Sequence, residues 1–119
     1  MDHRELAAEL FLSDCNCAQA VLEAFGDVTG LEKSFAAKLA SSFGGGMGRM
    51  REVCGAVSGM LMVAGLLYGY DDLGENDVNK KAHYRLVQNL AGQFREEIGS
   101  IICREILSNP PSDPNPTPR

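Results

Sequence analysis

The segment FGGGMGRMREVCGAVSGMLMVAGLLYGY, residues 43–70, decides the fold of this 119-residue chain. It opens with a run of glycines and then carries no charge from Val53 to Tyr70, where four more glycines interrupt an apolar sequence. A stretch of this length could cross a bilayer. However, the glycines lower its hydrophobicity, and every other expected helix is amphipathic. We therefore predict the buried central helix of a soluble bundle and no stable membrane insertion.

The rest of the chain is expected to be helical. All five prolines lie between Pro110 and Pro118, and apolar residues before them recur at intervals of three and four. This pattern predicts an all-α fold, a single-domain helical bundle of about five or six helices around the glycine-rich one. The domain covers residues 1–108, and residues 109–119 form a disordered proline-rich tail. The expected helices cover residues 4–12, 17–25, 34–43, 54–70 and 78–98, with a polar connection over 27–33 and a last helix, capped by Ser100, that carries Ile101 to Leu107.

Two helix starts and the clearest helix can be named from single residues. Asp2 and Asn16 are expected to cap the first two helices, and Gly26 to end the second. The long helix shows an apolar residue at every fourth position and ends at Gly99; this series is Val78, Ala82, Leu86, Leu90, Phe94 and Ile98.

Composition excludes several classes of partner. The net charge is −5 and no dense block of lysine and arginine occurs, which argues against binding to nucleic acid or to an anionic membrane surface. The N-terminus lacks the basic region, apolar run and cleavage site of a signal peptide. We therefore expect a cytoplasmic protein.

The cysteines are the candidate chemical groups. Cys15, Cys17, Cys54 and Cys103 are too few and too spread for a disulfide-stapled mini-protein, so in a reducing compartment they begin as thiols. Cys17 and Cys54 fall at expected helix starts, where unsatisfied N–H groups favour the thiolate. Arg49 and Arg51 add positive charge just before Cys54. If the two helix starts converge, the two thiols meet. The alternative is that Cys54 is a small hydrophobe in the core.

The same cysteines are candidate metal ligands. Four thiolates, from Cys15, Cys17, Cys54 and Cys103, could bind zinc or a small iron–sulfur cluster, and three would need a further ligand. Their spacing matches neither a zinc finger nor a ferredoxin, so this hypothesis depends on cysteine count alone.

Glycines are the second group of candidate site residues. The run Gly44, Gly45 and Gly46 lacks the strand and lysine of a nucleotide-binding loop, and predicts a turn whose amides lie near Cys54. Gly55 and Gly59 are one turn apart and let another backbone come close. That neighbour is the second helix, a second copy in a homodimer or a prosthetic group, which makes these five glycines candidate cofactor contacts.

Four segments in order resemble the C_GCAxxG_C_C family of redox-active proteins. They are Asn16-Cys17-Ala18-Gln19-Ala20-Val21, Phe43-Gly44-Gly45-Gly46-Met47-Gly48, Cys54-Gly55-Ala56-Val57-Ser58-Gly59, and Phe94 with Gly99-Ser100-Ile101-Ile102-Cys103-Arg104-Glu105. The resemblance implies a small helical protein, cytoplasmic or membrane-associated, of a kind found mostly in anaerobic bacteria and archaea. It also implies four characteristic cysteines, and a redox role inferred from them.

This sequence departs from the family pattern at one cysteine. Cys17, Cys54 and Cys103 occupy three of the four family positions. The fourth normally follows Cys103, where this chain has its cysteine-free tail, while Cys15 is additional. The departure favours a dithiol/disulfide pair or a three-cysteine site over a complete four-thiolate cluster.

Three hypotheses follow. The first is a thiol redox protein in which Cys17 and Cys54 form a reversible disulfide, Cys103 or Cys15 resolves it, and an unidentified redox partner exchanges electrons with it. The second is a metal or iron–sulfur protein that uses the same cysteines. The third is a non-catalytic homodimer that packs through Gly55 and Gly59. No substrate or electron donor can be read from the chain, nor whether it is an enzyme.

Overall fold

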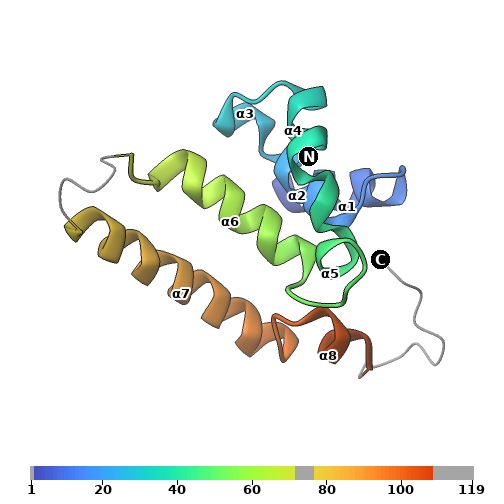
Figure 1. Ribbon diagram of the computed structural model, residues 1–119. Coiled ribbons are helices and arrows are strands. Elements are labelled where there is room, and N and C mark those ends of the chain that lie inside the picture. The colour runs from blue at the N-terminus through green and yellow to red at the C-terminus, as the bar shows by residue number, and fades with distance from the viewer. Residues whose placement is uncertain (1, 72–76, 109–119) are drawn as a thin grey trace.

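The computed structural model describes residues 2–71 and 77–108, and within these ranges the chain is helical (Figure 1). These residues form no β-strand. They include one isolated antiparallel pairing, between Val53 and Ile102. The predicted all-α, single-domain fold is therefore confirmed. The tail expected over residues 109–119 lies outside the described residues.

The first two helices begin where their caps predict. Helix α1 spans His3–Leu12 and α2 spans Cys17–Ala24. Asn16 accepts a hydrogen bond from the amide of Gln19 at 2.8 Å, and the Gln19 side chain accepts one from the amide of Asn16 at 2.9 Å. This reciprocal capping box fixes the start of α2 at Cys17. Asp2 and Glu5 form the same motif at the start of α1.

The connection between α2 and the glycine run is more broken than the sequence predicts. Helix α2 ends at Ala24 instead of running to Gly26, and a short helix, α3 (Gly26–Thr29), occupies part of the expected polar connection. The expected helix over 34–43 is α4 (Lys33–Ala40) followed by the 3₁₀-helix η1 (Ser41–Phe43). No proline marks these breaks in the sequence, because all five prolines lie between Pro110 and Pro118.

The glycine run is a compact buried turn instead of an open loop. Its helical assignment, α5 (Gly44–Met47), includes left-handed conformations at Gly45 and Gly46, with φ of 64° and 73°. Such angles suit a residue without a side chain. The turn reverses the chain tightly and brings it to the start of the next helix.

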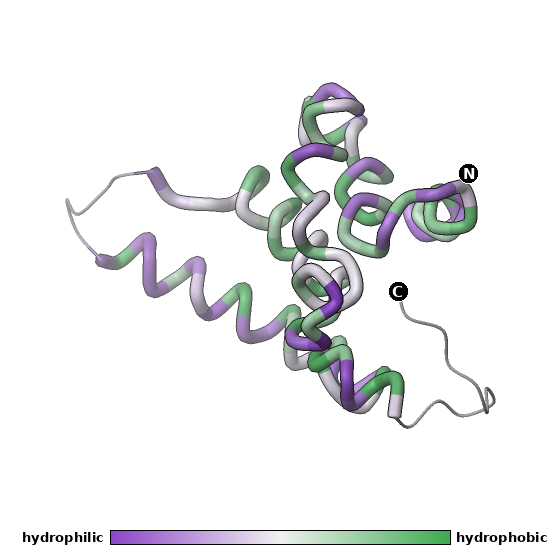
Figure 2. Tube along the Cα trace, turned by 45° about the vertical axis from the view of Figure 1, so that its right-hand side comes forward, coloured by the Kyte–Doolittle hydropathy of each residue, from purple (hydrophilic) through white to green (hydrophobic). Residues whose placement is uncertain are grey.

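The central helix is α6 (Gly55–Tyr68), which lies between α2 on one side and α7 (Val78–Ile98) on the other (Figure 1). The core forms where α2, α4 and α6 meet, and its buried members are Ala18, Leu22, Ala36, Ala40 and Val63. None of the residues of α7 is buried. In Figure 2 apolar and polar residues alternate along α7, as expected of a helix that covers one side of α6.

The last helix starts later than predicted. Helix α8 spans Cys103–Ser108, so Ile101 and Ile102 precede it. The Ser100 hydroxyl accepts a hydrogen bond from the amide of Ile102 at 2.9 Å and so orders the turn before α8 instead of capping it.

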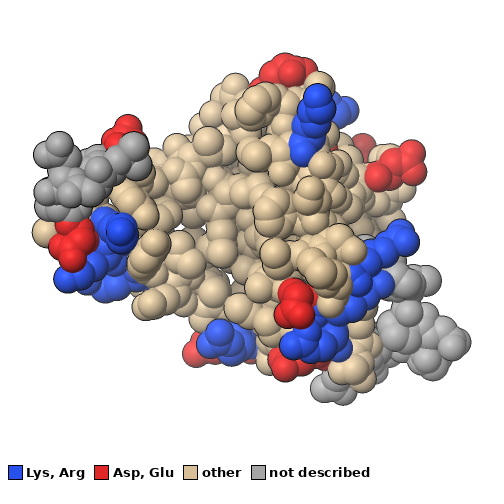
Figure 3. All heavy atoms as spheres, in the orientation of Figure 1, with Lys and Arg blue, Asp and Glu red and all other residues tan. Residues whose placement is uncertain are grey.

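Charge is distributed unevenly over the surface. Figure 3 shows charged side chains over α8 and over the start of α7, whereas the face above α6 has none. Across the described ranges, no helix combines the length and apolar character that a bilayer crossing requires.

Candidate functional site

The starts of α2 and α6 converge, which is the condition under which the sequence predicts that Cys17 and Cys54 meet. Cys17 is the first residue of α2, and Cys54 immediately precedes α6. A Cβ atom at Gly55 would lie 3.0 Å from the sulfur of Cys17 and 3.1 Å from the amide nitrogen of Ala18. The Cys17 sulfur therefore lies against the first residue of α6, next to Cys54.

A short backbone pairing brings Cys103 to the same place. The amide of Cys54 donates to the carbonyl of Ile101 at 2.8 Å, and the amide of Cys103 donates to the carbonyl of Glu52 at 2.6 Å. These bonds flank the pairing of Val53 with Ile102. Because side chains alternate between the two faces of extended chain, Cys54 and Cys103 point to the same face. No sequence pattern signals this pairing, since it joins single residues 49 positions apart.

Cys54 is the central thiol of the three, and it is 7% exposed. Burial raises its pKa above the ordinary value for a thiol; the amides of Ala56 and Val57 oppose this shift, and the neighbouring Cys17 and Cys103 add to it. The expectation that the helix start favours the Cys54 thiolate is therefore wrong in net direction. The amides face the sulfur without making a full capping hydrogen bond, so desolvation outweighs them.

Of the two arginines that the sequence places just before Cys54, Arg49 and Arg51, the second contacts the Cys103 thiol. The Arg51 guanidinium donates from Nη1 to the Cys103 sulfur at 3.8 Å and to the carbonyl of Gly45 at 3.4 Å. Arg51 and Arg49 both have left-handed backbone conformations, with φ of 62° and 65°. Such conformations are rare for residues with side chains and tend to occur at functional sites. Here they place a cation beside Cys103.

Cys15 is separate from the three thiols. Its sulfur donates to Oε2 of Glu23 at 3.3 Å, and burial, followed by this contact, raises its pKa. In the described part of the chain, no group of three or more His, Cys, Asp or Glu side chains is arranged to hold a metal ion. The metal assignment of Cys15, Cys17, Cys54 and Cys103 therefore stays a prediction that this arrangement does not support.

The glycines make room for the segments that carry the thiols. A Cβ at Gly44 would overlap the Asn16 side chain, and one at Gly46 would lie 2.7 Å from Cβ of Cys103. Protein atoms fill the space beside Gly44, Gly46, Gly55 and Gly59. A role for Gly44, Gly45, Gly46, Gly55 and Gly59 in holding a cofactor stays a prediction.

The close neighbour of the central helix is the second helix. A Cβ at Gly59 would lie 2.9 Å from the carbonyl oxygen of Ala18 and from Cβ of Val21, both in α2. The hypothesis of a homodimer that packs through Gly55 and Gly59 is therefore wrong as to the surface, because α2 of the same chain already covers it.

The cysteine pattern agrees with a family assignment. The family model described as "Putative redox-active protein (C_GCAxxG_C_C)" matches residues 15–118. The chain belongs to the C_GCAxxG_C_C family. No curated protein and no solved structure matches it. The predicted membership is thus confirmed, and the description of the family names redox activity as the function suggested for its members.

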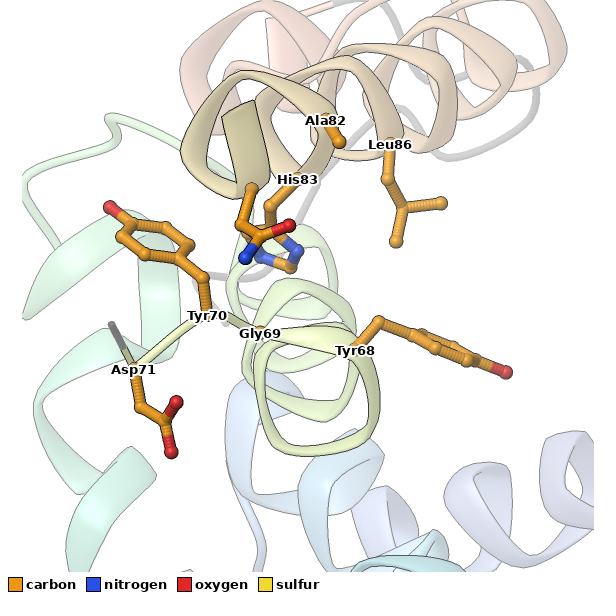
Figure 4. A pocket seen from close by; sticks show the side chains of 8 residues that line it. Tyr68, Gly69, Tyr70, Asp71, Ala82, His83 and Leu86 are labelled. Atoms are coloured by element: carbon orange, nitrogen blue, oxygen red, sulfur yellow. The ribbon is translucent and has the colours of Figure 1, made fainter. Parts of the chain in front are cut away.

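A cavity of this C_GCAxxG_C_C protein lies away from its thiols. It measures about 490 Å³ and lies between the end of α6 and the first half of α7 (Figure 4), where its lining includes Tyr68, Tyr70, Asn79 and His83. Nδ1 of His83 is buried there without a hydrogen-bond partner. The 14 residues of α6 separate this cavity from Cys54 by about 20 Å. It is therefore distinct from the thiol site, and no sequence motif indicated it.

Proposed function

We propose that this C_GCAxxG_C_C protein is a thiol redox protein in which Cys17 and Cys54 form a reversible disulfide. One observation carries the proposal: the Cys17 sulfur packs against Gly55, the residue next to Cys54. Disulfide formation needs two Cβ atoms within about 4.5 Å. The Cys17 sulfur already lies beside the residue that follows Cys54, and this closeness supports the pairing of the two thiols.

The reaction starts at Cys17 because Cys54 is buried. The Cys17 thiolate attacks one sulfur of a disulfide substrate, forms a mixed disulfide and releases the first thiolate. Cys54 then attacks the Cys17 sulfur and releases the second. The substrate disulfide gains two electrons, the two protein thiols lose them, and their protons leave on the two released thiols. Burial, which raises the pKa of Cys54, keeps this second thiol protonated until the mixed disulfide is in place.

Cys103 is the better candidate for a third, resolving thiol. It neighbours Cys54 through the pairing of Val53 with Ile102 and has Arg51 beside it, whereas Cys15 contacts Glu23. In this proposal Cys103 attacks the Cys54 sulfur of the Cys17–Cys54 disulfide, so that a Cys54–Cys103 disulfide forms and Cys17 is released as a thiol. Cys15 has no part in the cycle.

Peptide mapping after mild oxidation tests the proposal. The reduced full-length protein is treated with a small disulfide, alkylated and digested, and we expect a peptide pair linked through Cys17 and Cys54. Cys15→Ser is the matched control and should leave this linkage unchanged, whereas Cys17→Ser should abolish it. Oxidation that gives no linkage between Cys17 and Cys54 in the folded protein would overturn the proposal.

A further inference from the structure

The three neighbouring thiols differ in access. Cys54 and Cys103 are 7% and 5% exposed, whereas Cys17 is partly exposed and lines a surface groove of about 230 Å³. Exchange requires the attacking sulfur to reach a sulfur of the substrate. A substrate that enters this groove therefore meets Cys17 before either of the other two thiols.

The groove is apolar apart from the Cys17 sulfur. It runs between α1 and α2 with α6 at its floor, and its other lining residues are Ala7, Ala8, Phe11, Ala20, Val21 and Ala56. None of these side chains carries a charge or a hydrogen-bonding group. A charged substituent would lose hydration in the groove without replacement, whereas an apolar one gains by burial.

Size and charge restrict the substrate further. The groove is smaller than the sites that take drug-sized ligands, so it accommodates a group about as large as one benzene ring or branched alkyl chain. The chain carries a net charge of −5, which also disfavours the approach of anionic disulfides such as oxidised glutathione.

We propose that this groove is a substrate site for small disulfides whose substituents are uncharged and apolar, and that Cys17 is the sulfur that attacks them. The inference rests on the proposed function, since it names the substrate class of the same thiol pair. The substituent next to the attacked sulfur lies against the alanines of α1 and α2, and the leaving thiol departs toward solvent. Cys54 then displaces the bound thiol as described above.

Methanethiosulfonates test the selectivity, because reagents with different substituents share one leaving group. The Cys17 thiolate attacks the divalent sulfur, a new disulfide forms and methanesulfinate leaves. The reduced full-length protein is treated with the benzyl or the sulfonatoethyl reagent. Peptide mass spectrometry then follows oxidation of Cys17, as its adduct or as a Cys17–Cys54 disulfide. Cys15, outside the groove, is the internal control.

We expect the benzyl reagent to modify Cys17 on the order of tenfold faster than the sulfonatoethyl reagent, relative to the ratio in the urea-unfolded chain. Two variants at the exposed rim position Ala8 check that the groove is responsible. Ala8→Lys should increase the rate at which the anionic reagent modifies Cys17 roughly two- to fivefold, and Ala8→Glu should decrease this rate by a similar factor. Neither variant should alter the rates at Cys15.

Failure of this inference and failure of the proposed function give different results. Equal normalised rates for the two reagents, with a Cys17–Cys54 disulfide still formed, would overturn the substrate assignment alone. If the benzyl reagent labels Cys17 selectively but Cys54 never displaces the adduct, the result would support the substrate assignment of the groove. It would overturn the proposal that Cys17 and Cys54 form a redox pair. A ratio unchanged by both Ala8 variants would also overturn the assignment.

Discussion

The backbone of α6 at Gly59 packs directly on the carbonyl of Ala18 in α2, because a Cβ atom at Gly59 would lie 2.9 Å from that oxygen. Ala18 follows Cys17, so this contact sets how closely the two thiol-bearing helix starts approach. Gly59 therefore acts as a spacer for the thiol site.

Gly59→Ala should destabilise the protein. The added methyl group meets a backbone oxygen and Cβ of Val21, and overpacking of this kind costs roughly 1–3 kcal/mol in the free energy of unfolding. Urea unfolding measures the change. Gly65→Ala in the same helix is the matched control: it meets nothing within 4 Å and should stabilise by about 0.5–1 kcal/mol. Equal effects of the two substitutions would contradict close packing of α2 on α6.

Gly46→Ala should cost more than an alanine placed in another left-handed position. Gly46 and Gly30 have φ of 73° and 75°, so an alanine at either is strained by about 1–2 kcal/mol. A Cβ at Gly46 also lies 2.7 Å from Cβ of Cys103 and 2.8 Å from the backbone of Arg51, whereas Gly30 has open space. The difference between the two unfolding free energies isolates the crowding at Cys103. If Gly30→Ala proved as harmful as Gly46→Ala, the glycine turn would not support α8.

The helices could be predicted from sequence because they depend on local signals, whereas the meeting of two thiols could be predicted only conditionally, because it depends on the packing of α2 on α6. Asparagine, the residue at position 16, is favoured at N-caps, so the helix start at Cys17 can be recognised. Cys54 follows the glycine run and precedes the apolar helix. The position of Cys103 depends on a single pairing between Val53 and Ile102, which has no periodicity to read. The breaks after Ala24 and Ala40 are not visible in the sequence, because no proline stands at either position.

Electrostatics at the site could be predicted only in part. A helix start and nearby arginines are visible in the sequence, but the depth at which a thiol is buried is not. Burial therefore reversed the expected direction at Cys54, and the left-handed backbone at Arg51 directed its guanidinium to Cys103 instead.

Asn16→Ala should loosen the first turn of α2, which positions Cys17. The Asn16 side chain caps α2, and it also donates to the carbonyl of Ser41 at 3.2 Å. Loss of an N-cap costs about 1 kcal/mol. The first turn of α2 would then fray, so we expect slower formation of the Cys17–Cys54 disulfide as well as lower stability. Asn16→Asp keeps the acceptor for the Gln19 amide and loses only the hydrogen bond donated to Ser41. This variant should therefore retain most of the stability and most of the rate of disulfide formation. A disulfide rate in Asn16→Ala equal to that of the parent would contradict the argument.

A chelator should leave the reduced protein unchanged if the thiols act as a redox pair. A structural metal site contributes its binding free energy to folding, so removal of the metal would lower the unfolding midpoint. We expect anaerobically purified protein to show the same thermal midpoint with and without chelator. A clear drop, together with released zinc or iron, would instead favour the metal hypothesis for Cys17, Cys54 and Cys103.

Stability should fall with rising pH, and Cys54 should account for part of the fall. An unfolded thiol titrates near pH 8.5. Because burial raises the pKa of Cys54 in the folded state, the folded protein holds this proton more tightly than the unfolded chain does. The contribution is therefore fully present below about pH 8.5 and is lost as the pH rises from there through the folded pKa. Urea unfolding of the reduced protein on both sides of this value measures the slope.

The comparison that isolates Cys54 needs Cys15 removed, because burial and Glu23 raise the pKa of that thiol as well. In a Cys15→Ser background, Cys54→Ala should flatten the decline of the unfolding free energy with pH, since it removes the group that binds the extra proton. The same substitution costs packing at every pH, so only the slope is informative. A slope that Cys54→Ala leaves unchanged would show that desolvation does not dominate at Cys54. The amides at the start of α6 would then offset the effect of burial on the pKa, and the buried Cys54 thiol would ionise as readily in the folded protein as in the unfolded chain.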